Sequence, residues 1–285
     1  MNGISVIIPA YNEEAGIGGV LGEVESVLKN TGVDFEIIVV DDGSTDRTAE
    51  IVRGTGAVLV EQPANRGYGA ALKTGIGRAR YDRVLIVDAD GTYPPEAIPR
   101  LLAAAEDYDM VVGARTGENV AIPPFRRFPK WLLKKLADYL TGMKIPDLNS
   151  GLRIFRKEAT EKFLPILPDG FSFTTTITVA FLCNSRPVRY VPIDYHKRSG
   201  RSKFRPLQDT FNLLTLIIRT SLYFNPLKIF VPAGCVLLAL GLVLLTYRLI
   251  AGGGGMVTTV VLLMAGLQVL ALGLLADLID KRSAR

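Results

Sequence analysis

Residues 83–92 have the sequence Arg83-Val84-Leu85-Ile86-Val87-Asp88-Ala89-Asp90-Gly91-Thr92, in which an apolar run ends directly in two carboxylates. The apolar run is typical of a buried strand. Two acids at positions i and i+2 repel and raise each other's pKa unless something compensates their charge. A divalent cation would do so, because Mg²⁺ is usually held by one or two carboxylates together with phosphate oxygens. The alternative interpretation is a solvated Asp-Gly turn.

Similar runs rich in valine and isoleucine occur elsewhere in the first 115 residues. They predict strands over residues 4–9, 35–40, 57–60, 83–87 and 110–112. Helical spacing of apolar residues predicts helices between them, over residues 13–30, 45–53, 69–80 and 95–107. This alternation predicts an α/β domain with a mostly parallel sheet covered by helices on both faces.

The first two predicted strands also end in polar residues, Pro9-Ala10-Tyr11-Asn12-Glu13-Glu14 and Val39-Val40-Asp41-Asp42-Gly43-Ser44-Thr45-Asp46. Turns and helix caps explain both stretches, with Asn12 capping one helix and Ser44 or Thr45 the next. Contact with a base or a ribose is the other interpretation, because ligands of such sheets bind beyond the carboxyl ends of the strands. The two roles can coexist on neighbouring residues. Gly67 and Gly69 leave a similar choice between a nucleotide contact and a helix start.

Two long apolar segments lie near the C-terminus. Residues 229–245 contain 17 residues without a charge, and residues 256–276 contain 21 more. A bilayer core of about 30 Å needs roughly 20 apolar residues as a helix, so a transmembrane hairpin is predicted. Its outer ends carry the nearby basic residues, which predicts that the large domain and the C-terminus are cytoplasmic. A hairpin buried in a soluble core is the alternative.

Composition excludes several classes of protein. The 285 residues include one histidine, His196, and two cysteines, Cys183 and Cys235. A disulfide framework and metal sites built on several histidines are therefore excluded, and any divalent metal must be held by oxygen ligands. The net charge of +5 is weak evidence for a nucleic-acid partner. Basic clusters at residues 126–135, 196–205 and 281–285 instead favour contact with a membrane surface.

Amphipathic patterns predict two helices in the rest of the chain. Residues 131–140 are predicted to form a helix, and residues 207–224 a second one that is either interfacial or core-facing. We therefore expect a catalytic domain over residues 1–205, a juxtamembrane helix over residues 206–225, and two transmembrane helices with a short tail over residues 226–285.

Taken in order, P-A-Y-N-E, V-D-D-G-S-x-D and D-A-D resemble the family 2 glycosyltransferases with the GT-A fold. The resemblance covers about residues 4 to 210 and continues in motifs similar to the polyprenyl-phosphate branch, which includes dolichol-phosphate mannosyltransferase and bactoprenol glucosyltransferases. Those motifs are Pro94-Pro95-Glu96, Gly113-Ala114-Arg115, Asp147-Leu148-Asn149-Ser150-Gly151-Leu152-Arg153 and Arg198-Ser199-Gly200-Arg201-Ser202-Lys203-Phe204.

The resemblance implies roles for individual residues. The nucleotide sugar would be bound by residues after the first, second and fourth strands, and by a loop closing over the phosphates: Pro9, Tyr11, Glu13, Val40, Asp42, Asp88, Ala89, Arg198 and Lys203. Asp88 and Asp90 would meet Mg²⁺ or Mn²⁺, with Asp90 as the main ligand. Arg115 would lie where the donor and acceptor phosphates meet, and Arg126 or Arg127 would contact the lipid phosphate.

Two positions depart from the family pattern. Some relatives carry a metal-binding glutamine where this chain has Thr92, and relatives tend to have a serine where this chain has Lys130 and Trp131. Asp90, Arg115 and Asp147 are the candidate catalytic residues. Asp147 is expected either near the acceptor or as the cap of the turn that follows it.

The activity implied is metal-dependent, inverting transfer of a hexose from a nucleotide diphosphate sugar, of the UDP-glucose or GDP-mannose type. The acceptor would be a polyprenyl phosphate, undecaprenyl or dolichyl, at the cytoplasmic face of the cell membrane. A strong general base is unnecessary, because a phosphate monoester is ionised at pH 7 with a second pKa of about 6. The alternatives are a processive polysaccharide synthase and a non-enzymatic membrane-tethered scaffold. Assembly into homo-oligomers is left open.

Overall fold

The computed structural model describes residues 3–116, 127–170, 172–195, 223, 225–251 and 256–283, without the side chains of residues 127–133 and 280–283. The chain divides into two compact units, Met1–Thr210 and Phe211–Arg285, and each is described by itself.

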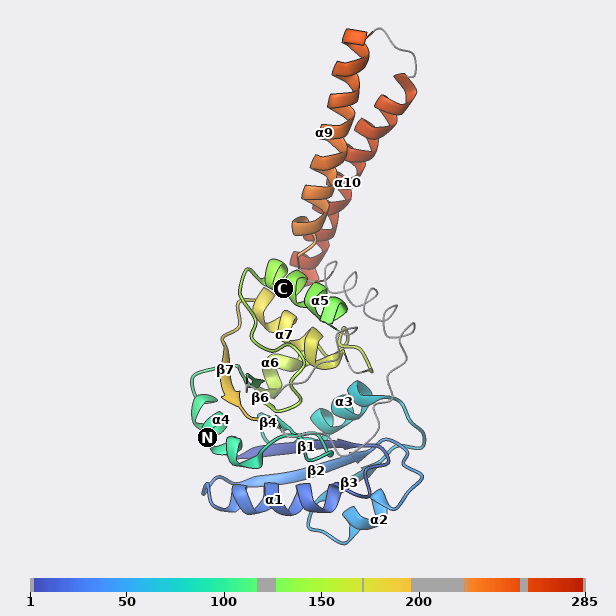
Figure 1. The fold of residues 1–285 in the computed structure, drawn as a ribbon. Helices are drawn as coiled ribbons and strands as arrows, with labels where there is room; N and C mark the ends of the chain where they lie inside the picture. Colours follow the sequence, from blue (N-terminus) through green and yellow to red (C-terminus); the bar gives the residue numbers. More distant parts are fainter. Residues whose placement is uncertain are drawn as a thin grey trace. The chain divides into compact units, whose positions relative to one another are not determined.

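The N-terminal unit is built on a seven-stranded sheet in the order β3-β2-β1-β4-β6-β5-β7 (Figure 1). All neighbours are parallel except β6, which runs antiparallel to both β4 and β5. The five predicted strands are confirmed, and two short strands were not predicted. The strands are β1 (Ile4–Ala10), β2 (Phe35–Asp41), β3 (Val58–Glu61), β4 (Arg83–Ile86), β5 (Met110–Arg115), β6 (Arg153–Arg156) and β7 (Val188–Ile193).

Helices cover both faces of the sheet, as predicted. They are α1 (Ile17–Lys29), α2 (Thr48–Arg53), α3 (Tyr68–Arg78), η1 (Pro95–Ala97), α4 (Ile98–Ala104), α5 (Arg127–Thr141), α6 (Lys157–Glu161) and α7 (Phe173–Cys183). The first helix begins at Ile17 rather than at the predicted Glu13. The reason is a tertiary contact: the backbone N–H groups of Glu13 and Glu14 donate to the side chains of Thr48, at the start of α2, and of Asp46, in the loop before it.

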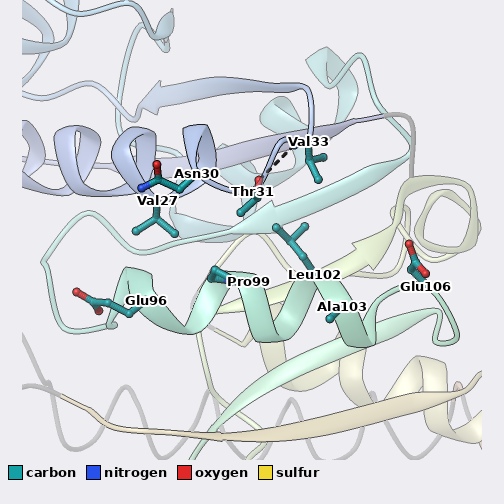
Figure 2. Close-up of a pocket in the computed structure, with 9 residues that line it drawn as sticks. All are labelled: Val27, Asn30, Thr31, Val33, Glu96, Pro99, Leu102, Ala103 and Glu106. Atoms are coloured by element: carbon teal, nitrogen blue, oxygen red, sulfur yellow. Dashed lines mark hydrogen bonds between the residues drawn. The ribbon is translucent and has the colours of Figure 1, made fainter.

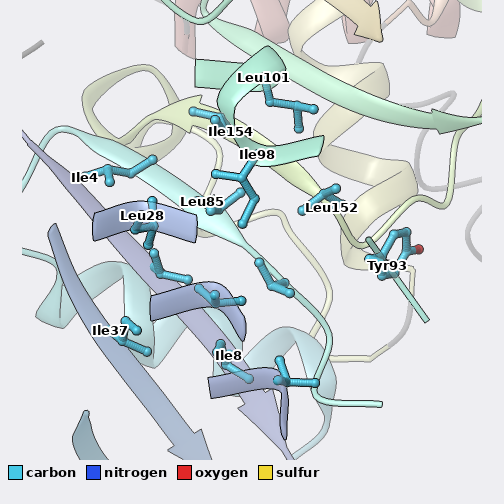
Figure 3. Packing of buried hydrophobic residues seen from close by; sticks show 14 of the residues in the cluster. Ile4, Ile8, Leu28, Ile37, Leu85, Tyr93, Ile98, Leu101, Leu152 and Ile154 are labelled. Carbon is cyan, nitrogen blue, oxygen red and sulfur yellow. The ribbon is translucent and has the colours of Figure 1, made fainter. Parts of the chain in front are cut away.

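The two faces of β1 pack against different helices. Ile4 and Ile8 belong to a buried cluster that includes α1 and α4, in which Leu28 and Leu101 are fully buried (Figure 3). Ile7 points to the opposite face, toward α3. Gly75 permits this packing, because a Cβ there would fall 2.5 Å from Cγ2 of Ile7. Burial on both faces explains why β1 is apolar at every position except the buried Ser5.

A shallow hollow lies between the end of α1 and the η1–α4 segment (Figure 2). Val27 and Leu102 are among its lining residues, with Glu96 and Glu106 as its charged groups. No lysine or arginine lines it, among the described residues, so it does not suit an anionic ligand. The polar residues at the carboxyl ends of β1, β2 and β4 do not line it.

The C-terminal unit contains two apolar helices, α9 (Leu227–Ala251) and α10 (Met256–Ser283). Both are long and apolar enough to cross a membrane by length and composition. They pack closely at Gly234 and Gly266, since a Cβ at either position would lie 3.1 Å from the carbonyl oxygen of the other. Outward-facing apolar side chains are largely exposed, and Ile250 is 88% exposed. Such exposure favours a lipid-facing hairpin over a hairpin buried in a soluble core.

Candidate active site

The polar loops after β1, β2 and β4 meet at one edge of the sheet. β1 lies between β2 and β4, and all three strands run in the same direction. Their carboxyl ends therefore lie side by side, where ligands of parallel sheets bind. The structure brings together three motifs that are far apart in the sequence.

The loops after β1 and β2 are bound to each other. Asn12 adopts φ of 55°, and its backbone N–H donates to Ser44 Oγ at 2.9 Å. Its side-chain oxygen accepts from the backbone N–H of Thr45 at 2.8 Å. The backbone N–H of Glu13 donates to Thr48 Oγ1 at 2.9 Å. Asn12 thus joins two loops instead of capping a helix.

Of the predicted nucleotide contacts, Tyr11 and Glu13 lie in the loop after β1. Pro9 and Val40 are register partners on β1 and β2, and both are buried. The backbones of Pro9 and Val40 therefore form the floor of the candidate site at this edge of the sheet. Tyr11 and Glu13 are partly exposed beside that floor.

Asp42 supports the start of α3. Its two carboxylate oxygens accept backbone hydrogen bonds from Arg66 and Gly67, each at 2.8 Å. Gly67 has φ of 103°, and a Cβ at Gly69 would lie 2.9 Å from the carbonyl carbon of Asp169. These contacts support the interpretation that Gly67 and Gly69 form the start of a helix, here α3. The buried Asp42 carboxylate fixes the loop beside the predicted nucleotide position.

Asp88 and Asp90 form the acidic pair at the end of β4. Burial and the charge of Asp90 raise the pKa of Asp88 to about 6, although a hydrogen bond from Tyr68 opposes the shift. The Tyr68 hydroxyl donates to Asp88 Oδ1 at 2.8 Å. Oδ1 of Asp90 accepts from Thr92 Oγ1 at 2.6 Å and from the Thr92 backbone N–H at 3.1 Å. Thr92, where some relatives carry glutamine, is therefore a hydrogen-bond donor to Asp90 in this structure.

The loop before β6 closes over the acidic pair. The Gly151 backbone N–H donates to the Tyr93 hydroxyl oxygen at 2.6 Å. A Cβ at Gly151 would fall 2.6 Å from Cγ of Asp88. The absence of a side chain at Gly151 is therefore what allows the loop to lie against the Asp88 carboxylate. No sequence signal tied Tyr68, Tyr93 or Gly151 to Asp88, because each lies on a different element.

Arg115 and Asp147 form a bidentate ion pair next to this loop. Nε of Arg115 donates to Oδ2 of Asp147 at 2.7 Å, and Nη2 donates to Oδ1 at 2.9 Å. Burial by itself would raise the pKa of Asp147, but the hydrogen bonds and charge of Arg115 lower it. The Asn149 backbone N–H also donates to Asp147 at 3.0 Å. Asp147 therefore both caps the turn after it and orients Arg115.

An aromatic ring lies against the Arg115 guanidinium. Its central carbon lies 5.2 Å from the centroid of the Tyr195 ring, a cation–π distance. Tyr195 in turn meets Tyr93 edge to face, with ring centroids 5.4 Å apart. These contacts join the end of β7 to the loops that carry Asp88 and Gly151.

Arg153 anchors the same loop from behind. It is fully buried, and its guanidinium donates to the carbonyl of Ser150, to the carbonyl of Thr174 and to Thr178 Oγ1. Burial lowers its pKa. Its hydrogen bonds tie the loop before β6 to helix α7, which holds Gly151 at the acidic pair.

Replacing Asp147 by Asn should lower the free energy of unfolding by about 2 kcal/mol at pH 7. The pair is largely buried, with Arg115 23% and Asp147 10% exposed. The lowered pKa of Asp147 stabilises the folded state above the unfolded-chain pKa of about 4, and this stabilisation is lost as pH falls through the folded-state pKa. Urea unfolding of the full chain in detergent, at pH 7 and pH 3, measures both effects.

Asp169→Asn is the matched control for this prediction. Asp169 pairs with Lys73 at 2.7 Å, but it is largely exposed, so its loss should cost less than 1 kcal/mol. Equal costs for the two variants would contradict the special contribution of the Arg115–Asp147 pair.

Some predicted residues lie outside the described residues: Arg126, Arg198, Lys203 and His196. Arg127 is the first residue of α5, but its side chain is not among those that the structure describes. Most of the predicted juxtamembrane helix also lies outside it.

A family model described as Glycosyl transferase family 2 matches residues 5–164, which is more than half of the chain. The chain belongs to glycosyl transferase family 2. This glycosyltransferase also matches a second model, described as the GtrB C-terminal hairpin, over residues 225–281. The family resemblance, the GT-A fold and the apolar hairpin are therefore confirmed.

Curated relatives of this glycosyltransferase match over almost its whole length. An undecaprenyl-phosphate 4-deoxy-4-formamido-L-arabinose transferase from Pseudomonas paraeruginosa is 34% identical, covering 98% of this chain and 85% of the relative. A protein of the same name from Aeromonas hydrophila is 31% identical, covering 98% of this chain and 88% of the relative.

Solved structures share the fold of this glycosyltransferase. The glucosyl-3-phosphoglycerate synthase of Mycobacterium tuberculosis, in complex with Mn²⁺, UDP and phosphoglyceric acid, superposes with a TM-score of 0.61 at 24% identity. The similarity covers 77% of this chain and 78% of the synthase. At this identity it shows the fold alone.

Proposed function

We propose that this glycosyltransferase transfers a sugar from a nucleotide diphosphate sugar to a polyprenyl phosphate at the cytoplasmic face of a membrane. The observation that carries the proposal is the acidic pair Asp88–Asp90 beside the Arg115–Asp147 ion pair, in a chain that also has an apolar hairpin. The undecaprenyl-phosphate transferases among its relatives support the acceptor class.

The donor would lie along the carboxyl ends of β1, β2 and β4. Tyr11, Glu13 and the Pro9–Val40 floor would contact the base and ribose. Asp42 would act through the loop that it holds before α3. Ala89, between the two acids, would line the part of the site that holds the sugar and phosphates of the donor.

The residues at the end of β4 fit a divalent cation. Asp88 and Asp90 offer hard carboxylate oxygens two positions apart, and burial together with the charge of Asp90 raises the pKa of Asp88, so a cation bound between them would stabilise both charged groups. We infer that Asp88 and Asp90 hold Mg²⁺ or Mn²⁺, as one or two carboxylates do at phosphate-binding sites. The cation would stabilise the charge that develops on the leaving nucleotide diphosphate. The Mn²⁺ and UDP named for a structural neighbour support this choice.

The acceptor phosphate would approach from the side of Arg115. Asp147 engages Nε and Nη2, and among the described residues Nη1 of Arg115 donates no hydrogen bond. Nη1 therefore suits a phosphate oxygen. An acceptor phosphate oxygen would attack the anomeric carbon as its bond to the nucleotide diphosphate breaks, which inverts the configuration. Arg198 and Lys203 would contact the donor phosphates, and Arg126 or Arg127 the lipid phosphate.

The hairpin would place this chemistry at a membrane. An antiparallel pair puts both outer ends on one side, and the sequence carries Lys281, Arg282 and Arg285 at its C-terminal end. We infer a cytoplasmic catalytic domain over residues 1–205, a juxtamembrane helix over residues 206–225 and a membrane hairpin over residues 226–285.

The test is transfer of labelled sugar into an organic-extractable lipid. The full chain in detergent would be incubated with undecaprenyl phosphate, Mg²⁺ or Mn²⁺, and a panel of labelled donors. The panel contains UDP-glucose, GDP-mannose and a donor of the 4-deoxy-4-formamido-L-arabinose named for the relatives. Lipid carrying one sugar is expected with one donor, and none with chelator or with undecaprenol lacking the phosphate.

Other outcomes identify the alternatives. A product carrying many sugars would indicate a processive synthase. Transfer to phosphoglyceric acid in place of the lipid would contradict the acceptor assignment. No transfer from any donor, with the chain folded, would favour the scaffold.

A further inference from the structure

Tyr68 is the first residue of α3 and reaches across to the end of β4. Its hydroxyl donates to Asp88 Oδ1 at 2.8 Å. Tyr68 and Asp88 are 20 residues apart in the sequence and belong to different elements. Among the described residues, Oδ2 of Asp88 accepts no hydrogen bond, so the two oxygens of this carboxylate are not equivalent.

The backbone that carries Tyr68 is fixed on both sides. Before it, the N–H groups of Arg66 and Gly67 donate to the Asp42 carboxylate. After it, the N–H of Ala70 donates to the carbonyl of Asp169 at 3.0 Å. A hydroxyl held this firmly can restrict the rotation of the carboxylate that it contacts, as partners of metal ligands do in other metal sites.

On the opposite side, the loop before β6 lies against the carboxylate. A Cβ at Gly151 would fall closest to Oδ2 of Asp88, so the missing side chain leaves space beside this oxygen, and the contacts of Arg153 and Tyr93 hold Gly151 in place. Asp88 is therefore held between the start of α3 and the loop before β6. The Tyr68 hydroxyl is the side-chain donor that directs Oδ1 toward α3.

We propose that Tyr68 is a positioning residue for Asp88, which by engaging Oδ1 presents Oδ2 to a divalent cation and raises the affinity of the acidic pair for it. The inference rests on the proposed function in one respect, namely that Asp88 is a metal ligand. It assigns a role to the start of α3 that differs from contact with the nucleotide.

The experiment compares Tyr68→Phe with the parent chain. Phenylalanine keeps the ring and its packing, so the variant loses the hydroxyl alone. Binding of Mn²⁺ to the full chain in detergent is measured by the loss of the free-ion electron paramagnetic resonance signal, without nucleotide and with UDP or GDP. We expect the Mn²⁺ dissociation constant to rise about tenfold, the lower end of the effect of removing such a partner.

Tyr81→Phe is the matched control. Tyr81 comes just before β4, whereas Asp88 comes just after it, so the two residues lie at opposite ends of this strand. The Tyr81 hydroxyl contacts Arg80. Its Mn²⁺ affinity should equal that of the parent. In transfer assays, Tyr68→Phe should raise the Mn²⁺ concentration needed for half-maximal rate while kcat at saturating Mn²⁺ stays close to the parent value. A structural defect would instead lower kcat and the melting temperature at every Mn²⁺ concentration.

The outcomes separate this inference from the proposed function. If the parent binds Mn²⁺, Asp90→Ala abolishes binding and Tyr68→Phe binds as tightly as the parent, the role of Tyr68 is wrong while the metal site stands. If the parent binds no Mn²⁺ under any of these conditions, both the metal site and the role of Tyr68 are wrong.

Discussion

Asp90→Ala is expected to lower sugar transfer by about 10²–10³-fold or more, the cost of removing one major electrostatic stabiliser of a developing charge. Asp90 follows β4 at the edge where the loops after β1, β2 and β4 meet, and it contributes to the negative charge that raises the pKa of Asp88. Its loss would remove the expected main metal ligand. Initial rates of lipid labelling at saturating donor and Mn²⁺ provide the measurement.

A second variant distinguishes the effect of the Asp90 charge on transfer from the effect of its hydrogen bonds within the turn. Oδ1 of Asp90 accepts two hydrogen bonds from Thr92, and asparagine keeps an oxygen at that position. Asp90→Asn should therefore preserve the turn but lose transfer nearly as completely as Asp90→Ala. Asp107→Ala, at an exposed position after α4, is the control and should retain full activity. Full activity of Asp90→Asn would show that the turn, and not the charge, is what the site needs.

Gly151→Ala is expected to lower transfer about 100-fold, because small displacements of reacting groups have effects of this size. A Cβ at Gly151 would overlap the Asp88 carboxylate, so either Asp88 or the loop before β6 must move. Movement of the loop would also break the hydrogen bond from the Gly151 N–H to Tyr93. Transfer rate and thermal unfolding of the full chain should be measured together.

Gly22→Ala is the matched control for this substitution. Gly22 lies in α1, and a Cβ there would meet no atom within 4 Å. Alanine should leave transfer unchanged and favour the helix by up to about 1 kcal/mol. Full activity of Gly151→Ala would mean that Asp88 can occupy another position without loss of function.

Hydrophobic periodicity predicted most of the N-terminal unit. β1, β2, β4 and β5 are mostly apolar and mostly buried, while β3, at the edge of the sheet, is half-exposed to exposed; the apolar runs are visible in neighbouring residues alone. β6 and β7 lack that pattern. β6 is four residues long and begins and ends with arginine, while β7 contains Arg189 and Pro192. Both are strands because the sheet supplies their partners.

The candidate site likewise contains features that the sequence predicted and features that it did not. Asp88 and Asp90 are only two positions apart and follow a strand, so their proximity was predictable. Arg115 and Asp147 are 32 residues apart, and their pairing depends on how β5 and the loop before β6 meet. Asp42 was predicted at the correct edge, but its hydrogen bonds to the start of α3 were not.

The amino-acid sequence alone determined the α/β alternation, the acids at the strand ends and the two apolar segments, because each depends on residues within a few positions of one another. The tertiary structure alone decided that Tyr68 and Gly151 enclose Asp88, that Arg115 is oriented by Asp147, and that an antiparallel strand lies within the sheet. These contacts join elements distant in the chain. Their geometry follows from strand order and close packing, which local patterns of hydrophobicity do not encode.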